Sequence, residues 1–362
     1  MPELINDAAF RSDAQTAVDS IYNFKFQAAD KQLRPWQEQY PDHPLWDLMD
    51  GIKLWWQVLS DLEDPSNDEQ FFNLMKRVDY KASQLLRRQR SHADALIIKA
   101  VSNGYIGRQY ANRSEWISSV NQARKAMSAY EYLLELKPDL ADLKLAEGMK
   151  LYYSAHLPEA YPIVKTVSWF LPEGDKEEGL KLMKVASEEA IFARAEATYF
   201  LGNINYNYEH NYETALRHFR SLYETYPNNN YYVRYYVRVL YRMKKYETAL
   251  NVISESLQRW EQNSLAFESV LREELLTWKG RMLTKENKKD EALSSLRLAF
   301  EAGFDLPATQ NRSYHVISGF LLGKLLHENN SRVESKKVLT HVAACKAEPE
   351  YREAAQKLMD NS

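Results

Sequence analysis

The pentapeptide Tyr-Glu-Thr-Ala-Leu occurs twice in this chain, at residues 212–216 and again at residues 246–250. The two copies are displaced by 34 residues, a length typical of a repeat unit built from two helices. A short match can arise by chance. A genuine repeat must therefore reproduce its other positions at their own spacings.

Those other positions do recur. A small residue is followed four and seven places later by packing residues. A proline stands five places after the second of these packing residues. A small residue lets two helices cross closely, the larger residues fill the groove between them, and the proline ends the helix. Three sets, beginning at Ala249, Ala292 and Ser335, lack only the proline. Four sets are complete: Ala29, Leu33, Trp36 and Pro41; Ala126, Tyr130, Leu133 and Pro138; Ala160, Val164, Val167 and Pro172; Ala215, Phe219, Leu222 and Pro227.

The first helix of each pair should also carry a small residue where it crosses the second. Glycines stand about twelve residues before the small residues of the second helices. A glycine inside a helix costs about 1 kcal/mol relative to alanine, so a repeated glycine needs a packing reason. Close helix crossings supply that reason at Gly148, Gly202, Gly280 and Gly323, whereas Gly51 and Gly104 fit the spacing less closely.

This pattern resembles the tetratricopeptide repeat over most of the chain, most specifically over residues 202–256. The stretch from Trp169 to Leu180, with the 212–227 unit, is also similar to the tetratricopeptide family that includes the inclusion-body clearance proteins. The resemblance implies an all-α fold, a right-handed α-α superhelix of antiparallel helix pairs.

Irregular spacing in the middle of the chain predicts a bend or interruption near residues 155–190. Pro158 and Pro162 crowd one helix, and an extra helix is expected around residues 177–189. We therefore predict two parts, N-terminal repeats over residues 1–174 and C-terminal repeats over residues 175–362 that end in a capping helix.

Composition restricts the possible partners and compartment. The 362 residues carry a net charge of -3, which argues against a general nucleic-acid binder. No apolar run is long enough to span a membrane, and the first residues do not resemble a signal peptide. A soluble cytoplasmic protein is expected; export is the alternative if a signal was removed.

No catalytic motif is found. None of the eight histidines forms a His-x-x-x-His pair enclosing a glutamate, and there is no phosphate-binding loop or Gly-x-Ser-x-Gly turn. Adjacent carboxylates such as Glu273 and Glu274 point about 100° apart on a helix. Cys345 is the only cysteine, has no histidine beside it, and is predicted to be a small buried residue near a helix end. We predict no enzyme activity, no cofactor and no metal.

In tetratricopeptide proteins the first helices line a concave surface that binds peptides, so the resemblance implies a scaffold or adaptor that binds a peptide or helix of a partner protein. Tyrosine-rich surfaces suit peptide binding, although any one tyrosine could instead pack between repeats. Tyr199 stands where a carboxylate-clamp lysine would be, so that clamp is not supported. The inward positions are Tyr105, Arg108, Met149, Tyr152, Tyr199, Asn203, Tyr206, Tyr232, Tyr236, Arg281, Lys324 and His327.

A second function stays open, the binding of a small molecule or lipid near the central bend. Tyr161, Trp169 and Phe170 gather there with two prolines, and an enclosed apolar pocket would suit such a ligand. The sequence leaves the identity of the protein partner and the oligomeric state open.

Overall fold

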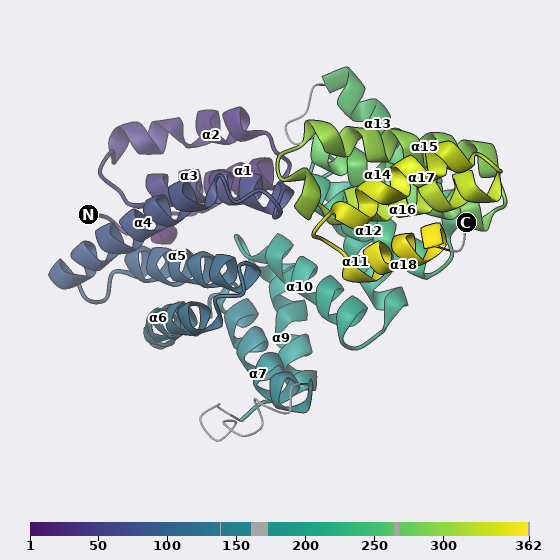
Figure 1. The fold of residues 1–362 in the computed structure, drawn as a ribbon. Helices are drawn as coiled ribbons and strands as arrows, with labels where there is room; N and C mark the ends of the chain where they lie inside the picture. Colours follow the sequence, from purple (N-terminus) through teal and green to yellow (C-terminus); the bar gives the residue numbers. More distant parts are fainter. Residues whose placement is uncertain (138, 161–172, 264–267, 361–362) are drawn as a thin grey trace. The chain divides into compact units, whose positions relative to one another are not determined.

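The computed structural model describes residues 1–137, 139–160, 173–263 and 268–360. Within these ranges the regular structure is entirely helical, with 17 α-helices and no strand. Many consecutive helices pack against each other as antiparallel hairpins, among them α1 with α2, α5 with α6, α10 with α11 and α14 with α15 (Figure 1). The all-α architecture of helix pairs predicted from the sequence is therefore confirmed.

The chain divides into two compact units. Unit 1 contains residues 1–56 and 67–226. Its helices are η1 (Leu4–Asn6), α1 (Ala8–Tyr22), α2 (Phe26–Gln39), most of α3 (Leu45–Ser60), α4 (Asp68–Arg88), α5 (Ala93–Asn112), α6 (Trp116–Leu136), α7 (Leu143–Ala160), α9 (Lys176–Glu189), α10 (Arg194–Asn207) and α11 (Tyr212–Thr225).

Unit 2 contains residues 57–66 and 227–362. The first helices of its pairs, α12, α14 and α16, contact one another in order, and α18 packs on α16 and α17 at the position of a terminal cap. The helices are α12 (Asn230–Arg242), α13 (Tyr246–Asn263), α14 (Glu268–Lys285), α15 (Lys289–Ala302), η3 (Gly303–Asp305), η4 (Thr309–Asn311), α16 (Ser313–Glu328), α17 (Arg332–Ala344) and α18 (Pro349–Asp360).

Glycines mark the helix crossings, as the repeat pattern predicts. A Cβ on Gly202, Gly280 or Gly323 would lie within 2.9 Å of a large side chain on the following helix. In each case this side chain stands four residues after the small residue of the second helix, at Phe219, Leu296 and Leu339. Only a glycine lets the two helices approach so closely.

The hairpin of α5 and α6 uses a different glycine from the one considered in the sequence. A Cβ on Gly104 would meet nothing within 4 Å, whereas a Cβ on Gly107 would lie 3.3 Å from the Ser119 carbonyl oxygen. The helix therefore crosses its partner one turn later than the spacing from Gly104 suggested.

The turn inside the hairpins has a recurring backbone conformation. Six residues that follow a first helix adopt φ between 52° and 62°. The next amide can then donate to a carbonyl near the helix end, as Lys245 does to Leu240 at 2.9 Å and Lys288 does to Leu283 at 2.9 Å, which satisfies carbonyls that the helix leaves unpaired. The turn residues are too varied for a sequence pattern to show this: Phe24, Ser114, His210, Lys244, Asn287 and Asn330.

The central interruption is organised around α7 and α9. These two helices pack against each other, although residue 174 lies between them in the sequence. They cross where Gly148 on α7 contacts Gly179 on α9. The helix expected near residues 177–189 thus takes the place of the second helix of α7. Residues 161–172, including Tyr161, Trp169 and Phe170, lie outside the described residues. The division near residue 174 stays a prediction about the repeats, whereas the boundaries of the two compact units in the sequence fall after residues 56, 66 and 226.

Acid should destabilise unit 1 through His218. This half-buried ring on α11 has its pKa lowered to about 4 by burial and by the cations Arg217 and Lys184. The unfolded chain binds a proton below the ordinary histidine pKa of 6.5, so stability falls as the pH drops from there toward 4. Urea unfolding followed by circular dichroism should show that wild type loses about 2 kcal/mol more than His218→Gln between pH 7 and pH 5. Equal losses of stability in wild type and His218→Gln would contradict the lowered pKa of His218.

Candidate functional site

Two predicted inward residues of unit 1 contact one carboxylate, and a third contacts one of these two. Arg108 lies 3.3 Å from Glu196 Oε2, and the hydroxyl of Tyr105 donates to Glu196 Oε1 at 3.4 Å. The Arg108 guanidinium also lies over the ring of Tyr199, 5.2 Å from its centroid, and over Trp55 at 5.3 Å. Burial and the Glu196 charge raise the pKa of Tyr105 far above its usual range. These side chains are engaged with one another.

The other predicted residues of unit 1 lie in or near the core. Tyr152 is fully buried and donates its hydroxyl to Glu209, while Met149 packs against the same apolar cluster. Asn203 donates to the Tyr199 hydroxyl at 3.4 Å, and the ring of Tyr206 contacts that of Tyr212. Tyr206 and Asn203 are half-buried.

In unit 2 the predicted tyrosines differ from the predicted cations in exposure. Tyr232 and Tyr236 on α12 are buried, with 1% and 7% of their surface exposed. Arg281 on α14 and His327 on α16 are half-buried, and Lys324 on α16 is exposed. Arg281, Lys324 and His327 are therefore the members of this set that a partner can reach.

A buried carboxylate organises the same helices. Glu274 on α14 pairs with Arg238 at 2.7 Å and with Arg234 at 3.1 Å, both on α12. Burial opposes the ionisation of Glu274, but the two guanidinium groups outweigh it and lower its pKa. Trp278 Nε1 also donates to Glu274 at 3.3 Å. The ion pairs fix the register of α12 against α14.

Arg281 is held by rings alone. Its guanidinium lies 4.6 Å from the ring centroid of Trp278 and 5.2 Å from that of Tyr241. Within the described part of the chain, no carboxylate forms an ion pair with it. Stacking of this kind leaves the edge of the guanidinium, with its N–H donors, free to bind an oxyanion.

Three cations share one register on the successive helices α12, α14 and α16. Arg238, Arg281 and Lys324 each stand eleven residues before the small residue of their own second helix. Their helices contact one another in order, so we call these three residues the cation column. The sequence predicted only Arg281 and Lys324 of this column, because Tyr232 and Tyr236 rather than Arg238 were taken as the inward positions of α12.

The rings around the column were missed in the sequence. Arg238 lies over Tyr235 at 5.2 Å and over Tyr314 at 5.9 Å, as Arg281 lies over Trp278. Tyr235 and Trp278 both stand three residues before their cation. This spacing is visible in the sequence and could have identified the rings. Two of the three cations in the column therefore lie over aromatic rings.

One group among the described residues has the composition of a metal site. Three potential ligand atoms, from His315, His341 and Cys345, lie within 4.8 Å of one another. Within those same ranges, no helix combines the length and the apolar character needed to cross a bilayer.

Comparisons with known proteins give a limited result. No family model and no curated protein matches the sequence. The crystal structure of yeast Tom70 is similar to this chain, with a TM-score of 0.46 and 15% sequence identity over 87% of this chain and 63% of that one. The chain therefore aligns with less than two thirds of that structure. The fold assignment rests on the helix pairs described above.

Proposed function

We propose that this protein is a non-catalytic interaction scaffold that binds an acidic peptide segment of a partner protein on the inner helices of unit 2. The observation that carries the proposal is Arg281, a half-buried cation that lies against the rings of Trp278 and Tyr241 and has no carboxylate partner among the described residues. A side-chain or terminal carboxylate of a peptide supplies the missing anion.

The neighbours of Arg281 support a peptide rather than a small anion. Lys324 offers a second exposed cation at the equivalent position of the next helix, and the half-buried rings of Tyr235 and Trp278 offer flat apolar area beside the cations. Aromatic and arginine side chains are the residues that contribute most to binding at protein interfaces. A run of acidic and apolar residues matches this surface.

Selection of short random peptides on the full-length protein tests the proposal. The selected peptides should be enriched in Asp and Glu, and their Kd, measured by fluorescence anisotropy, should rise with salt. Arg281→Gln removes a charged hydrogen-bond donor, so we expect it to weaken binding by about tenfold or more.

Lys336→Gln is the matched control, because it removes the same charge from an exposed position on the second helix α17. This variant should bind the selected peptides like wild type. Selection of peptides without acidic residues, or equal binding by Arg281→Gln and wild type, would contradict the proposal.

The unit 1 residues grouped around Glu196 remain candidates for a second contact surface. Tyr105, Arg108 and Tyr199 already pair with groups of their own unit, so a partner there has to compete with these interactions. Binding of a small molecule or lipid near the bend stays a prediction, because the rings on which it depends lie outside the described residues.

A further inference from the structure

The cluster of His315, His341 and Cys345 joins two helices of unit 2. His315 lies on α16, His341 lies on α17, and Cys345 ends α17 one turn after His341. The Nε2 atoms of the two imidazoles face each other at 2.9 Å. His315 and Cys345 are buried, with 0% and 3% of their surface exposed, and His341 is half-buried. Two imidazoles and a thiol therefore meet at a site where only His341 is partly exposed.

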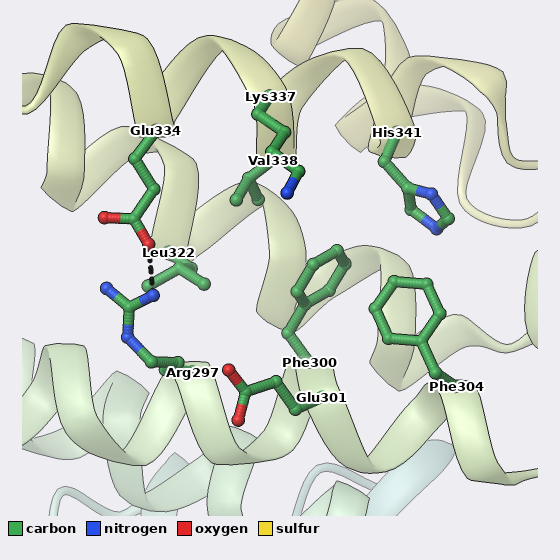
Figure 2. Close-up of a pocket in the computed structure, with 9 residues that line it drawn as sticks. All are labelled: Arg297, Phe300, Glu301, Phe304, Leu322, Glu334, Lys337, Val338 and His341. Atoms are coloured by element: carbon green, nitrogen blue, oxygen red, sulfur yellow. Dashed lines mark hydrogen bonds and ion pairs between the residues drawn. The ribbon is translucent and has the colours of Figure 1, made fainter.

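Aromatic rings enclose the cluster on one side. Phe300 stacks on His315 with ring centroids 4.6 Å apart, and Phe304 contacts His315 and His341 at 4.7 Å and 4.9 Å. Figure 2 shows both phenylalanines beside His341, at one end of a cavity of about 290 Å³. The opposite end holds the ion pair of Arg297 and Glu334. An apolar shell of this kind limits water access while the cavity leaves an approach to His341.

A buried carboxylate lies near His315 on the side of Nδ1. His315 Nδ1 and Glu273 Oε1 lie 2.3 Å and 2.6 Å from the single point where a Cβ would stand on Gly303. Glu273 is 1% exposed, and its Oε1 has no hydrogen-bond partner among the described residues. A histidine that ligates a metal through Nε2 ordinarily donates its Nδ1–H to such a second-shell oxygen. His315 Nδ1 likewise has no hydrogen-bond partner among the described residues. This bond is therefore not formed in the structure, and one of the two side chains must shift for Glu273 to orient His315.

The spacing of the ligand atoms is close to that of a zinc site. Zn–N bonds of about 2.0–2.1 Å at tetrahedral angles place two ligand nitrogens about 3.3 Å apart, compared with 2.9 Å between the two Nε2 atoms. The Cys345 sulfur lies within 4.8 Å of the two Nε2 atoms. It must move toward them by up to roughly 1 Å to form a Zn–S bond of about 2.3 Å. Cys345 is the C-cap of α17 and has extended backbone, so a small adjustment there does not disturb a helix.

We propose that His315, His341 and Cys345 bind one Zn²⁺, with water from the adjoining cavity as the fourth ligand. Each imidazole gives a lone pair from Nε2, and the Cys345 thiol releases its proton to solvent as the Zn–S bond forms, so no oxidation or reduction takes place. His315 and His341 come from different helices of unit 2, so the ion stabilises the packing of α16 against α17. This site is separate from the cation column.

This site is not apparent from the sequence, because its ligands do not all lie close together in the chain. His341 and Cys345 are one helical turn apart, which is a signal in the sequence, but His315 stands 26 residues before His341. The absence of a metal was predicted from the single cysteine. Only the packing of α16 on α17 supplies the third ligand.

Cobalt titration of the full-length protein, made without a histidine tag and stripped with a chelator, tests the proposal directly. One equivalent of Co²⁺ should produce a thiolate-to-cobalt charge-transfer band and the intense visible bands of tetrahedral cobalt, and Zn²⁺ should displace it. A wild-type protein that shows no charge-transfer band at one equivalent of Co²⁺ overturns the proposal whatever the variants do.

Variants then assign the ligands. Cys345→Ser, which is nearly isosteric, should abolish the charge-transfer band, and His341→Gln should weaken Zn²⁺ binding by on the order of a hundredfold or more, judged by competition with a chromophoric chelator. His327→Gln changes a histidine of the same helix as His315 and should bind Zn²⁺ like wild type. Circular dichroism checks that each variant is folded. Retention of the charge-transfer band by folded Cys345→Ser contradicts the assignment.

Discussion

Replacing Arg312 with glutamine should lower the free energy of unfolding of unit 2 by about 4 kcal/mol. The Arg312 side chain is 1% exposed and lies 3.1 Å from Glu273 and 3.0 Å from Asp61, with Glu63 at 3.7 Å. Without the guanidinium, buried carboxylates face one another without a cation, which costs far more than the loss of an exposed pair. Urea unfolding followed by circular dichroism measures the change.

The same substitution should loosen residues 57–66. Asp61 and Glu63 belong to this segment, which is part of unit 2 although it is distant in sequence from α16. Glu63 also accepts a hydrogen bond from the Ser313 amide at 2.8 Å. Hydrogen exchange should therefore become faster over residues 57–66 in Arg312→Gln.

Arg220→Gln provides the control for Arg312. This arginine pairs with Glu224 one turn away on α11, and both side chains are more than half exposed, so its loss should leave the unfolding free energy close to that of wild type. If Arg312→Gln unfolds at the same urea concentration as wild type, the buried cluster does not hold the segment in place.

Gly148→Ala should destabilise unit 1 by about 3 kcal/mol, although it adds a single methyl group. The new Cβ would lie 2.6 Å from the Gly179 carbonyl oxygen and 2.8 Å from Met183 Cγ. A backbone carbonyl cannot move aside as a flexible side chain can, so α7 and α9 must separate. Urea unfolding measures the loss, and hydrogen exchange should show it over α7 and α9.

Gly104→Ala is the opposite case on the neighbouring pair of helices. A Cβ at Gly104 meets nothing within 4 Å, and alanine is favoured over glycine inside a helix, so this variant should gain about 0.5–1 kcal/mol. A similar loss of stability in Gly148→Ala and Gly104→Ala would show that the α7–α9 crossing is not as close as the structure places it.

The sequence by itself determined the helix pairs. The repeated pentapeptide and the crossings of Gly202, Gly280 and Gly323 were all visible in it. Each of these contacts joins residues within one hairpin, fewer than twenty residues apart in the chain. Over such distances the helical period alone decides which side chains meet.

The tertiary structure decided which hairpin elements pair in the irregular region and which side chains meet from different hairpins. The close packing of α7 on α9 depends on Gly179, which the repeat pattern did not include. Arg312 meets Asp61 across 251 residues of sequence, and His315 meets His341 from another helix. Glu274 likewise pairs with Arg234 and Arg238 from another hairpin. Contacts of this kind depend on the rotation and stacking of whole helices, and no local period in a single sequence encodes them.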